Sequence, residues 1–347
     1  MSDEILSLIY TFSKKFNDPI TKLSFEEKNN NILAIVKNGN VNISINITGN
    51  DPEKYNDIRR FLKKNVEQIP GVLSVNVVLT TESKNDQVES RFKIDSKNII
   101  AIASGKGGVG KSTFAVNIAT ALKTIGKQVG LLDADIYGPS IPRMMGISGR
   151  PQGNESKKLI PLESYGIKLM SIGFLVNVDT PTIWRGPMVM KALEQMFNGV
   201  EWGKLDYLII DLPPGTGDAQ LSLAQNSKIS GSIIVSTPQD VALTDARKGI
   251  NMFKRVNVDV LGLVENMSYF ICENCNEKHY IFSKDGAKNE ADKFQIPFLG
   301  SIPINKQLRI QSDNGKPSCI DDPKSDISKL YLSIAKNLDE RLKTKHS

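Results

Sequence analysis

Residues 105–113 read Gly105-Lys106-Gly107-Gly108-Val109-Gly110-Lys111-Ser112-Thr113 and match the phosphate-binding pattern G-x-x-x-x-G-K-[ST]. The stretch before them is typical of a strand, and the stretch after them is typical of an apolar helix. In that setting the glycines let backbone N–H groups face a phosphate, and the helix N-terminus adds a favourable dipole. We expect all nine residues to bind ATP, with Lys111 reaching the β- and γ-phosphates and Ser112 holding Mg²⁺.

Carboxylates follow two further apolar stretches. Asp133 and Asp135 end the run Val129–Leu132, and Asp211 ends the run Tyr207–Ile210. Open α/β sheets bind ligands at the carboxyl ends of their strands, so these side chains are expected near the phosphate loop. Asp211 has the position of a Walker B aspartate and is predicted to bind Mg²⁺ together with Ser112.

The remainder of the chain alternates in the same way. Short apolar runs separated by helical segments extend from residue 98 to the C-terminus, which predicts a three-layer α/β fold with a mostly parallel central sheet. Residues 1–80 show helical spacing, two strand-like runs, a second helix and a third strand, and are predicted to form a small α+β domain. The polar residues 81–97 are interpreted as a linker, and residues 98–347 as the ATPase domain.

Composition narrows the class of protein. The formal net charge is +6, but the basic residues occur in short scattered pairs without interleaved aromatics, so no nucleic-acid partner is expected. No apolar run approaches the ~18 residues that a membrane helix needs, so no membrane partner is expected. The 3 cysteines are too few for a disulfide framework, and the N-terminus is acidic, so we expect a cytoplasmic protein.

The phosphate loop contains a lysine besides Lys111, and this lysine resembles one found in a known class of ATPases. Lys106, directly after the first glycine, is similar to the signature lysine of the deviant Walker A ATPases, a class that includes the Min and Par proteins. The resemblance implies that Lys106 crosses a dimer interface to the partner's nucleotide and so takes part in catalysis. It also implies that Asp135 lies in the first switch and orients the attacking water. A solvated lysine remains the alternative.

Two cysteines form a CxxC pair. Cys272 and Cys275 alone are compatible with zinc, iron–sulfur or redox chemistry, and the metal sites need about four ligands. A homodimer would bring two pairs together and supply all four. His279 offers a further ligand, although a surface histidine is the commoner case, and Cys319 is interpreted as a lone structural thiol.

Several motifs in order resemble the Mrp/ApbC-type iron–sulfur cluster carrier ATPases. They are the phosphate loop, Asp133-Ala-Asp-Ile-Tyr-Gly-Pro-Ser140, Trp184-Arg-Gly-Pro-Met188, Asp211-Leu-Pro-Pro-Gly-Thr-Gly-Asp218, and Glu265-Asn-Met-Ser268 ahead of the CxxC. The resemblance implies a [4Fe–4S] cluster bridged between subunits by Cys272 and Cys275, supplied by an assembly scaffold and passed to apo iron–sulfur proteins. It implies that Asn266 contacts adenine. Residues 1–90 resemble, more loosely, a small iron–sulfur assembly domain, and Glu273 stands where the family commonly has proline.

Three other functions agree less well with the sequence. The first is a targeting ATPase that handles apolar clients and holds structural zinc at the CxxC, but the sequence lacks a long apolar helical insertion. The second is a membrane-positioning ATPase, but the C-terminal helix carries Asp339 and Glu340 and no Trp or Phe. The third is an electron-donating reductase similar to nitrogenase iron protein, which uses differently spaced cysteines.

Overall fold

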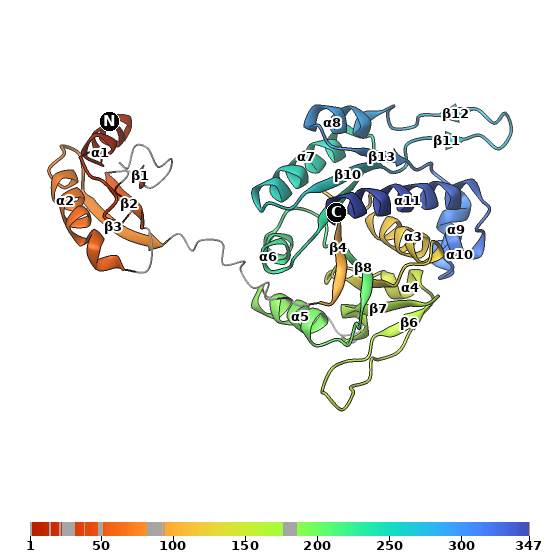
Figure 1. Cartoon of the computed structure of the whole chain (residues 1–347). Helices are drawn as coiled ribbons and strands as arrows, with labels where there is room; N and C mark the ends of the chain where they lie inside the picture. Colours follow the sequence, from red (N-terminus) through yellow and green to blue (C-terminus); the bar gives the residue numbers. More distant parts are fainter. Residues whose placement is uncertain are drawn as a thin grey trace. The chain divides into compact units, whose positions relative to one another are not determined.

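The chain folds as two compact units, Met1–Glu89 and Ser90–Ser347, seen in a computed structural model (Figure 1). The structure describes residues 2–13, 15–20, 22, 32–37, 39–47, 51–81, 92, 94–175 and 186–346. Most of the predicted linker over 81–97 lies outside these residues, as does part of the Trp184–Met188 motif.

The first unit is a three-stranded sheet with helices on one face. Its elements are α1 (Ser2–Ser13), β1 (Ile32–Lys37), β2 (Asn40–Ile47), the 3₁₀ turn η1 (Pro52–Tyr55), α2 (Asn56–Val66) and β3 (Ser74–Thr81). β1 pairs antiparallel with β2, and β2 pairs parallel with β3. Alternate residues of β2, among them Val41, Ile43 and Ile45, are buried against the helices, as the period of a half-covered strand requires.

The second unit has an eight-stranded sheet in the order β13-β10-β9-β4-β8-β5-β7-β6. All neighbours are parallel except the edge pair β6–β7. The strands are β4 (Ser96–Ala103), β5 (Val129–Asp133), β6 (Leu162–Ser164), β7 (Ile167–Ser171), β8 (Leu205–Asp211), β9 (Gly231–Ser236), β10 (Val260–Glu265) and β13 (Phe298–Ser301). Every residue of β5 and β9 is buried, because helices cover both faces.

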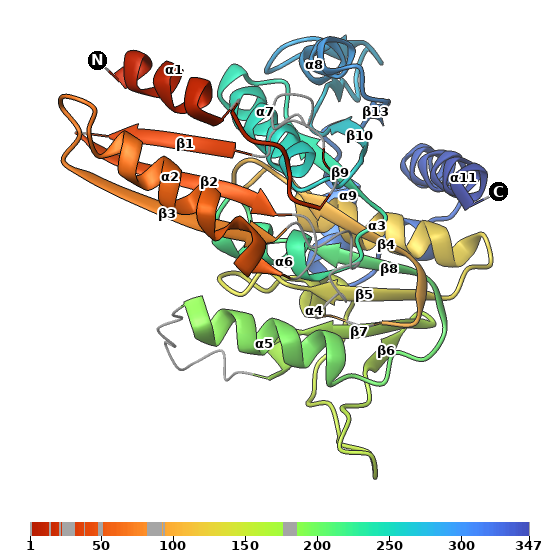
Figure 2. The same cartoon turned by 60° about the vertical axis from the view of Figure 1, so that its left-hand side comes forward.

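Helices lie on both sides of this sheet. They are α3 (Lys111–Thr124), α4 (Ile141–Met144), α5 (Gly186–Asn198), α6 (Asp218–Asn226), α7 (Asp240–Arg255), α8 (Gly286–Phe294), α9 (Lys306–Asp313), α10 (Ser318–Asp321) and α11 (Asp326–His346), with a short turn η2 (Ile172–Phe174). Figure 2 shows α3 and α11 on one side of the sheet and α5, α6 and α7 on the other. The three-layer α/β fold with a mostly parallel sheet is therefore confirmed.

Two hairpins were not predicted. The edge pair β6–β7 turns at Tyr165 and Gly166, which both have positive φ (53° and 71°), the geometry of a tight hairpin turn. The second hairpin is β11 (Phe270–Ile271) with β12 (Lys278–His279). Both were missed because their strands are too short to show a period-2 pattern.

None of the helices among the described residues is both long enough and apolar enough to cross a membrane.

Candidate functional site

The phosphate loop connects the end of β4 to the start of α3. Gly108 and Gly110 have φ of 80° and 84°, a left-handed conformation that favours glycine. A Cβ on Gly108 would meet nothing within 4 Å, so the loop is open on that side, whereas a Cβ on Gly110 would collide with the side chain of Asn266. The loop thus presents its backbone to an open space at the N-terminus of a 14-residue helix, a site suited to an anion.

Lys111 of the loop lies against two carboxylates. Its Nζ is 2.7 Å from Asp211 Oδ1 and 3.5 Å from Asp135 Oδ2. The lysine side chain is only 6% exposed, and that of Asp211 is fully buried. The structure thereby brings together three residues that the sequence predicted for catalysis or for Mg²⁺.

Asp211 retains an oxygen able to take a cation. Its Oδ2 is buried and has no hydrogen-bond partner among the described residues. Burial raises the pKa of Asp211, an effect that the neighbouring Lys111 ammonium opposes. A partly unpaired carboxylate beside the Ser112 hydroxyl is the donor set that Mg²⁺ prefers in P-loop sites, so these residues fit the ion.

Asp133 organises the loop that carries Asp135. The register pairs Asp133 with Asp211 on neighbouring strands. Asp133 accepts hydrogen bonds from Ser171 Oγ (3.0 Å) and from the backbone N–H groups of Asp135 and Ile141 (both 3.2 Å). Burial and the nearby Asp211 raise the pKa of Asp133 to about 8. The sequence placed Asp133 at a strand end without a role, because Ser171 comes from a strand that was not predicted.

Lys106 is half-buried, and its side chain contacts a residue of its own chain that is distant in sequence. Its Nζ lies 3.4 Å from Oε1 of Gln239, the residue before α7. The loop passes close to α7, since a Cβ on Gly105 would collide with the backbone of Asp245. Lys106 therefore connects the phosphate loop to the start of α7 within this chain.

Asn266 contacts the phosphate loop itself. It follows β10 directly, and its backbone N–H donates to Ser236 O at 2.7 Å. Its side-chain Nδ2 donates to Val109 O at 2.8 Å. The residue predicted for adenine contact is thus held at the base of the loop, where its side chain occupies the space that Gly110 leaves open.

The cysteine pair lies on the hairpin β11–β12. Cys272 is half-buried and Cys275 is exposed. The backbone N–H groups of Cys275 and Asn274 lower the pKa of the Cys272 thiol. Cys319 lies elsewhere, buried at 2% exposure, and burial raises the pKa of its thiol to about 11.

His279 joins the cysteine pair. One ligand atom from each of Cys272, Cys275 and His279 lies within 4.8 Å of the others. The sequence offered His279 as a further ligand but favoured a surface histidine, and the structure shows it exposed and beside the thiols. The CxxC spacing by itself could not reveal this, because the proximity depends on the hairpin pairing.

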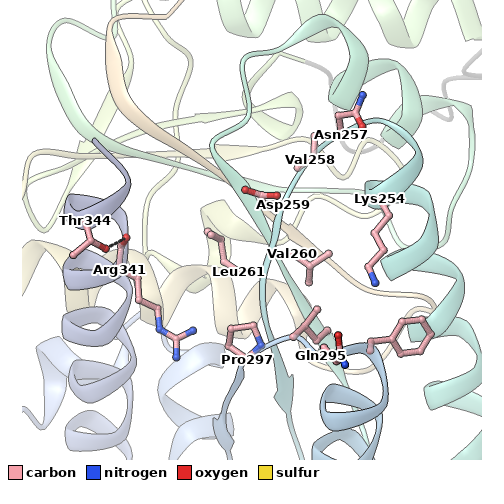
Figure 3. Close-up of a pocket in the computed structure, with 12 residues that line it drawn as sticks. Lys254, Asn257, Val258, Asp259, Val260, Leu261, Gln295, Pro297, Arg341 and Thr344 are labelled. Carbon is pink, nitrogen blue, oxygen red and sulfur yellow. Dashed lines mark hydrogen bonds between the residues drawn. The ribbon is translucent and has the colours of Figure 1, made fainter. Parts of the chain in front are cut away.

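One cavity lies away from these groups. It measures about 720 Å³ and is lined by residues around the amino end of β10, including Val260, Leu261 and Pro297. Lys254 of α7 and Arg341 of α11 approach it from two sides (Figure 3). Asn266 marks the opposite, carboxyl end of β10, so this cavity is not the nucleotide site.

Comparison with known proteins places the second unit in a family. A family described as ParA, NUBPL iron-transfer P-loop NTPase, matches residues 95–339. An iron–sulfur protein required for NADH dehydrogenase, mitochondrial, from Arabidopsis thaliana is 56% identical over 71% of this chain and 79% of its own length. An iron–sulfur cluster carrier protein from Synechocystis is 42% identical over 95% of this chain and 96% of its own length, so the similarity extends into the first unit.

Solved structures agree with this placement. A nucleotide-binding protein from Archaeoglobus fulgidus, in complex with ADP and described with cobalt, matches with a TM-score of 0.60 and 40% identity, covering 68% of this chain and 93% of its own. The cell division ATPase MinD from Pyrococcus furiosus matches with a TM-score of 0.53 at 21% identity, over 71% and 99% of the two chains. The MinD similarity shows the fold alone.

Proposed function

The chain belongs to the family of NUBPL iron-transfer P-loop NTPases, and from that premise we propose that it is an ATP-dependent carrier of a [4Fe–4S] cluster. The cluster is cargo, received from an assembly scaffold and transferred to apo iron–sulfur proteins. The observation that carries the proposal is the pair of half-buried Cys272 and exposed Cys275 on a P-loop NTPase of this family. Relatives named as iron–sulfur cluster carriers support it.

The cluster is held between two copies of the chain. A [4Fe–4S] cluster takes four thiolates. Within one chain only Cys272 and Cys275 lie together, since Cys319 is buried elsewhere. A symmetric homodimer doubles the cysteine pair and completes the set.

ATP binds along the loop Gly105–Thr113. On nucleotide binding, Lys111 would turn from Asp211 to the β- and γ-phosphates, and Ser112 and Asp211 would hold Mg²⁺, which would neutralise phosphate charge. The short distance between Lys111 and Asp211 and the unpaired Asp211 oxygen support this exchange. The ADP complex of the Archaeoglobus relative supports nucleotide binding by this chain.

The remaining site residues take the roles implied by family resemblance. Asp135, close to Lys111, orients the attacking water. Lys106 leaves its own Gln239 and reaches the partner subunit's nucleotide. Asn266 turns from the loop carbonyl to contact adenine. Hydrolysis then proceeds by positioning and electrostatic stabilisation, without a covalent intermediate. We place the protein in the cytoplasm.

Anaerobic reconstitution with iron and sulfide tests the carrier function. The wild type is expected to form a brown cluster, one per two chains, that restores activity to an apo enzyme needing a [4Fe–4S] cluster. Cys272→Ser and Cys275→Ser are expected to lose the cluster while keeping ADP binding, and Cys319→Ser, the matched control, is expected to keep it. A full cluster in Cys272→Ser would refute bridging. Colourless protein with zinc shared between two chains would instead support the targeting ATPase.

A further inference from the structure

The hairpin β11–β12 places three metal-ligand side chains of one chain together. Phe270 pairs with His279 across the two strands, and Cys272 N–H donates to Glu277 O at 3.0 Å. Asn276, with φ of 58°, turns the chain between them. This geometry puts both thiols at the turn and the imidazole on the returning strand, with the ligand atoms within 4.8 Å of one another.

Those spacings are close to what a single ion requires. Zinc binds thiolate sulfur at about 2.3 Å and imidazole nitrogen at about 2.0 Å, so tetrahedral ligand atoms stand ~3.3–3.8 Å apart. The backbone hydrogen bonds of the hairpin already hold the three residues near each other. We therefore expect side-chain rotation to bring the ligand atoms from within 4.8 Å to these tetrahedral separations. Thiolates with an imidazole suit Zn²⁺ and Fe²⁺ better than Mg²⁺ or Ca²⁺.

We propose that Cys272, Cys275 and His279 of a single chain bind one divalent transition-metal ion, Zn²⁺ or Fe²⁺. Among the described residues no further Cys, His, Asp or Glu joins this group, so the fourth coordination position is left open. The site deepens the proposed function, because it uses the same cysteines, but it needs no second chain and no cluster.

The exposure of the hairpin supports a bound ion. Every side chain from residue 273 to residue 284 is exposed, and only two residue pairs join the strands. Phe270 of β11 also bridges to Ile304, but the pairing of so short a hairpin contributes little stability in water. A metal ion bonded to both strands contributes its binding energy to their folding.

The single ion and the bridged cluster exclude each other. Both use the thiolates of Cys272 and Cys275, whereas His279 serves only the single ion. A chain loaded with Zn²⁺ is therefore expected to accept a cluster more slowly than the metal-free chain. Occupancy of the single-ion site would in this way regulate loading.

Titration of the metal-free, monomeric chain with Co²⁺ tests the site. We expect one Co²⁺ per chain, with tetrahedral visible bands and a thiolate charge-transfer band. His279→Ala is expected to weaken binding at least about tenfold, the minimum cost of disturbing a metal-site partner. His346→Ala alters the only other histidine and is expected to match the wild type. Competition with Zn²⁺ and with Fe²⁺ then identifies the preferred ion.

A second variant separates ligation from folding. His279→Cys is expected to keep one Co²⁺ per chain and to strengthen the charge-transfer band, because three thiolates replace two.

Unchanged Co²⁺ affinity in His279→Ala, or one Co²⁺ shared by two wild-type chains, would refute the single-chain site. Cluster reconstitution in His279→Ala at the wild-type yield, with Co²⁺ affinity lost, would support it. A wild type that binds Co²⁺ as described but never a cluster would refute only the carrier function.

Discussion

At the scale of single residues, the arrangement around Lys111 explains how the phosphate loop tolerates buried charge. Its ammonium lies 2.7 Å from Asp211 and 3.5 Å from Asp135, and the lysine and Asp211 are nearly inaccessible to water. Buried charges are stable only when paired, so Lys111 and the two carboxylates stabilise one another.

Asp211→Asn is expected to abolish the dependence of ATP hydrolysis on Mg²⁺ and to lower kcat by about 10²–10³-fold, because a preorganised charge at the site is lost. Steady-state phosphate release over a Mg²⁺ series measures this effect. Asp206→Asn is the matched control, since Asp206 lies at the opposite end of the same strand, β8, where it pairs with Lys97. Equal loss in both variants would contradict the assignment of Asp211.

Lys106→Ala is expected to lower kcat by about 10²–10³-fold, with ADP affinity retained, if the lysine stabilises charge in the partner subunit's site. Lys97→Ala, at the far end of β4, is the control. Mixing Lys106→Ala with Asp211→Asn discriminates further. Each mixed dimer then contains one complete site, so about a quarter of wild-type activity returns. No recovery on mixing would place the action of Lys106 within its own chain.

At the scale of elements, α8 holds the end of β10 in position. The buried carboxylate of Glu265, the last residue of β10, accepts the backbone N–H of Ala287 at 2.7 Å in the first turn of α8. A carboxylate at a helix N-terminus is favoured by the helix dipole. Glu290 of α8 in turn accepts two hydrogen bonds from Arg247 of α7, at 2.6 and 2.9 Å. These contacts position the segment that continues into Asn266.

Stability is expected to depend on Glu290 at neutral pH and not in acid. Hydrogen bonds from Arg247 lower the pKa of Glu290 from 4.5 to about 2. The stabilisation is therefore complete above about pH 4.5 and is lost as the pH falls towards 2. Glu290→Gln is expected to lower the free energy of unfolding by about 1.5–3 kcal/mol at pH 7 and by progressively less below pH 4.5.

Urea unfolding from pH 7 down to pH 3 measures that difference between wild type and Glu290→Gln. Glu340→Gln, an exposed position on α11, is the control and is expected to unfold as the wild type does. A difference that does not change with pH would show that the packing of Glu290, and not its charge, stabilises the α7–α8 contact.

At the scale of the whole molecule, the chain is two separately packed units with a dividing point at Ser90. Phe92 belongs to the core of the second unit although it precedes β4. It is 1% exposed, its ring stacks on Phe197 of α5 at 4.8 Å, and its N–H donates to Asn226 O. The predicted linker over 81–97 thus includes a core residue. The sequence did not reveal it, because one apolar side chain in a polar stretch shows no periodicity.

A chain starting at Ser90 is expected to fold and to bind ADP as the full chain does. A chain starting at Asn98 lacks Phe92 and is expected to be less stable by about 3–5 kcal/mol, the usual cost of removing a buried phenylalanine. Phe92→Ala in the full chain is expected to show a similar loss. Thermal unfolding with and without ADP compares all three, and equal stability of the two truncated chains would show that Phe92 contributes nothing.

The features that the sequence by itself determined are local along the chain. The phosphate loop, the buried strands, the strand-end carboxylates and the CxxC pair are each written in a few consecutive residues. Their residue types and spacing follow from turn geometry, from burial on two faces and from ligand chemistry. For that reason the fold class and family were predictable before any coordinates.

The tertiary structure alone decided what those features contact. Lys111 meets Asp211 across 100 residues of sequence and Asn266 meets Val109 across 157, because the strand order brings β8 and the end of β10 to the phosphate loop. His279 meets the thiols because of one strand pairing, and Phe92 enters a core formed by residues far along the chain. Such contacts depend on register and strand order, which short-range patterns of apolar and polar residues do not encode.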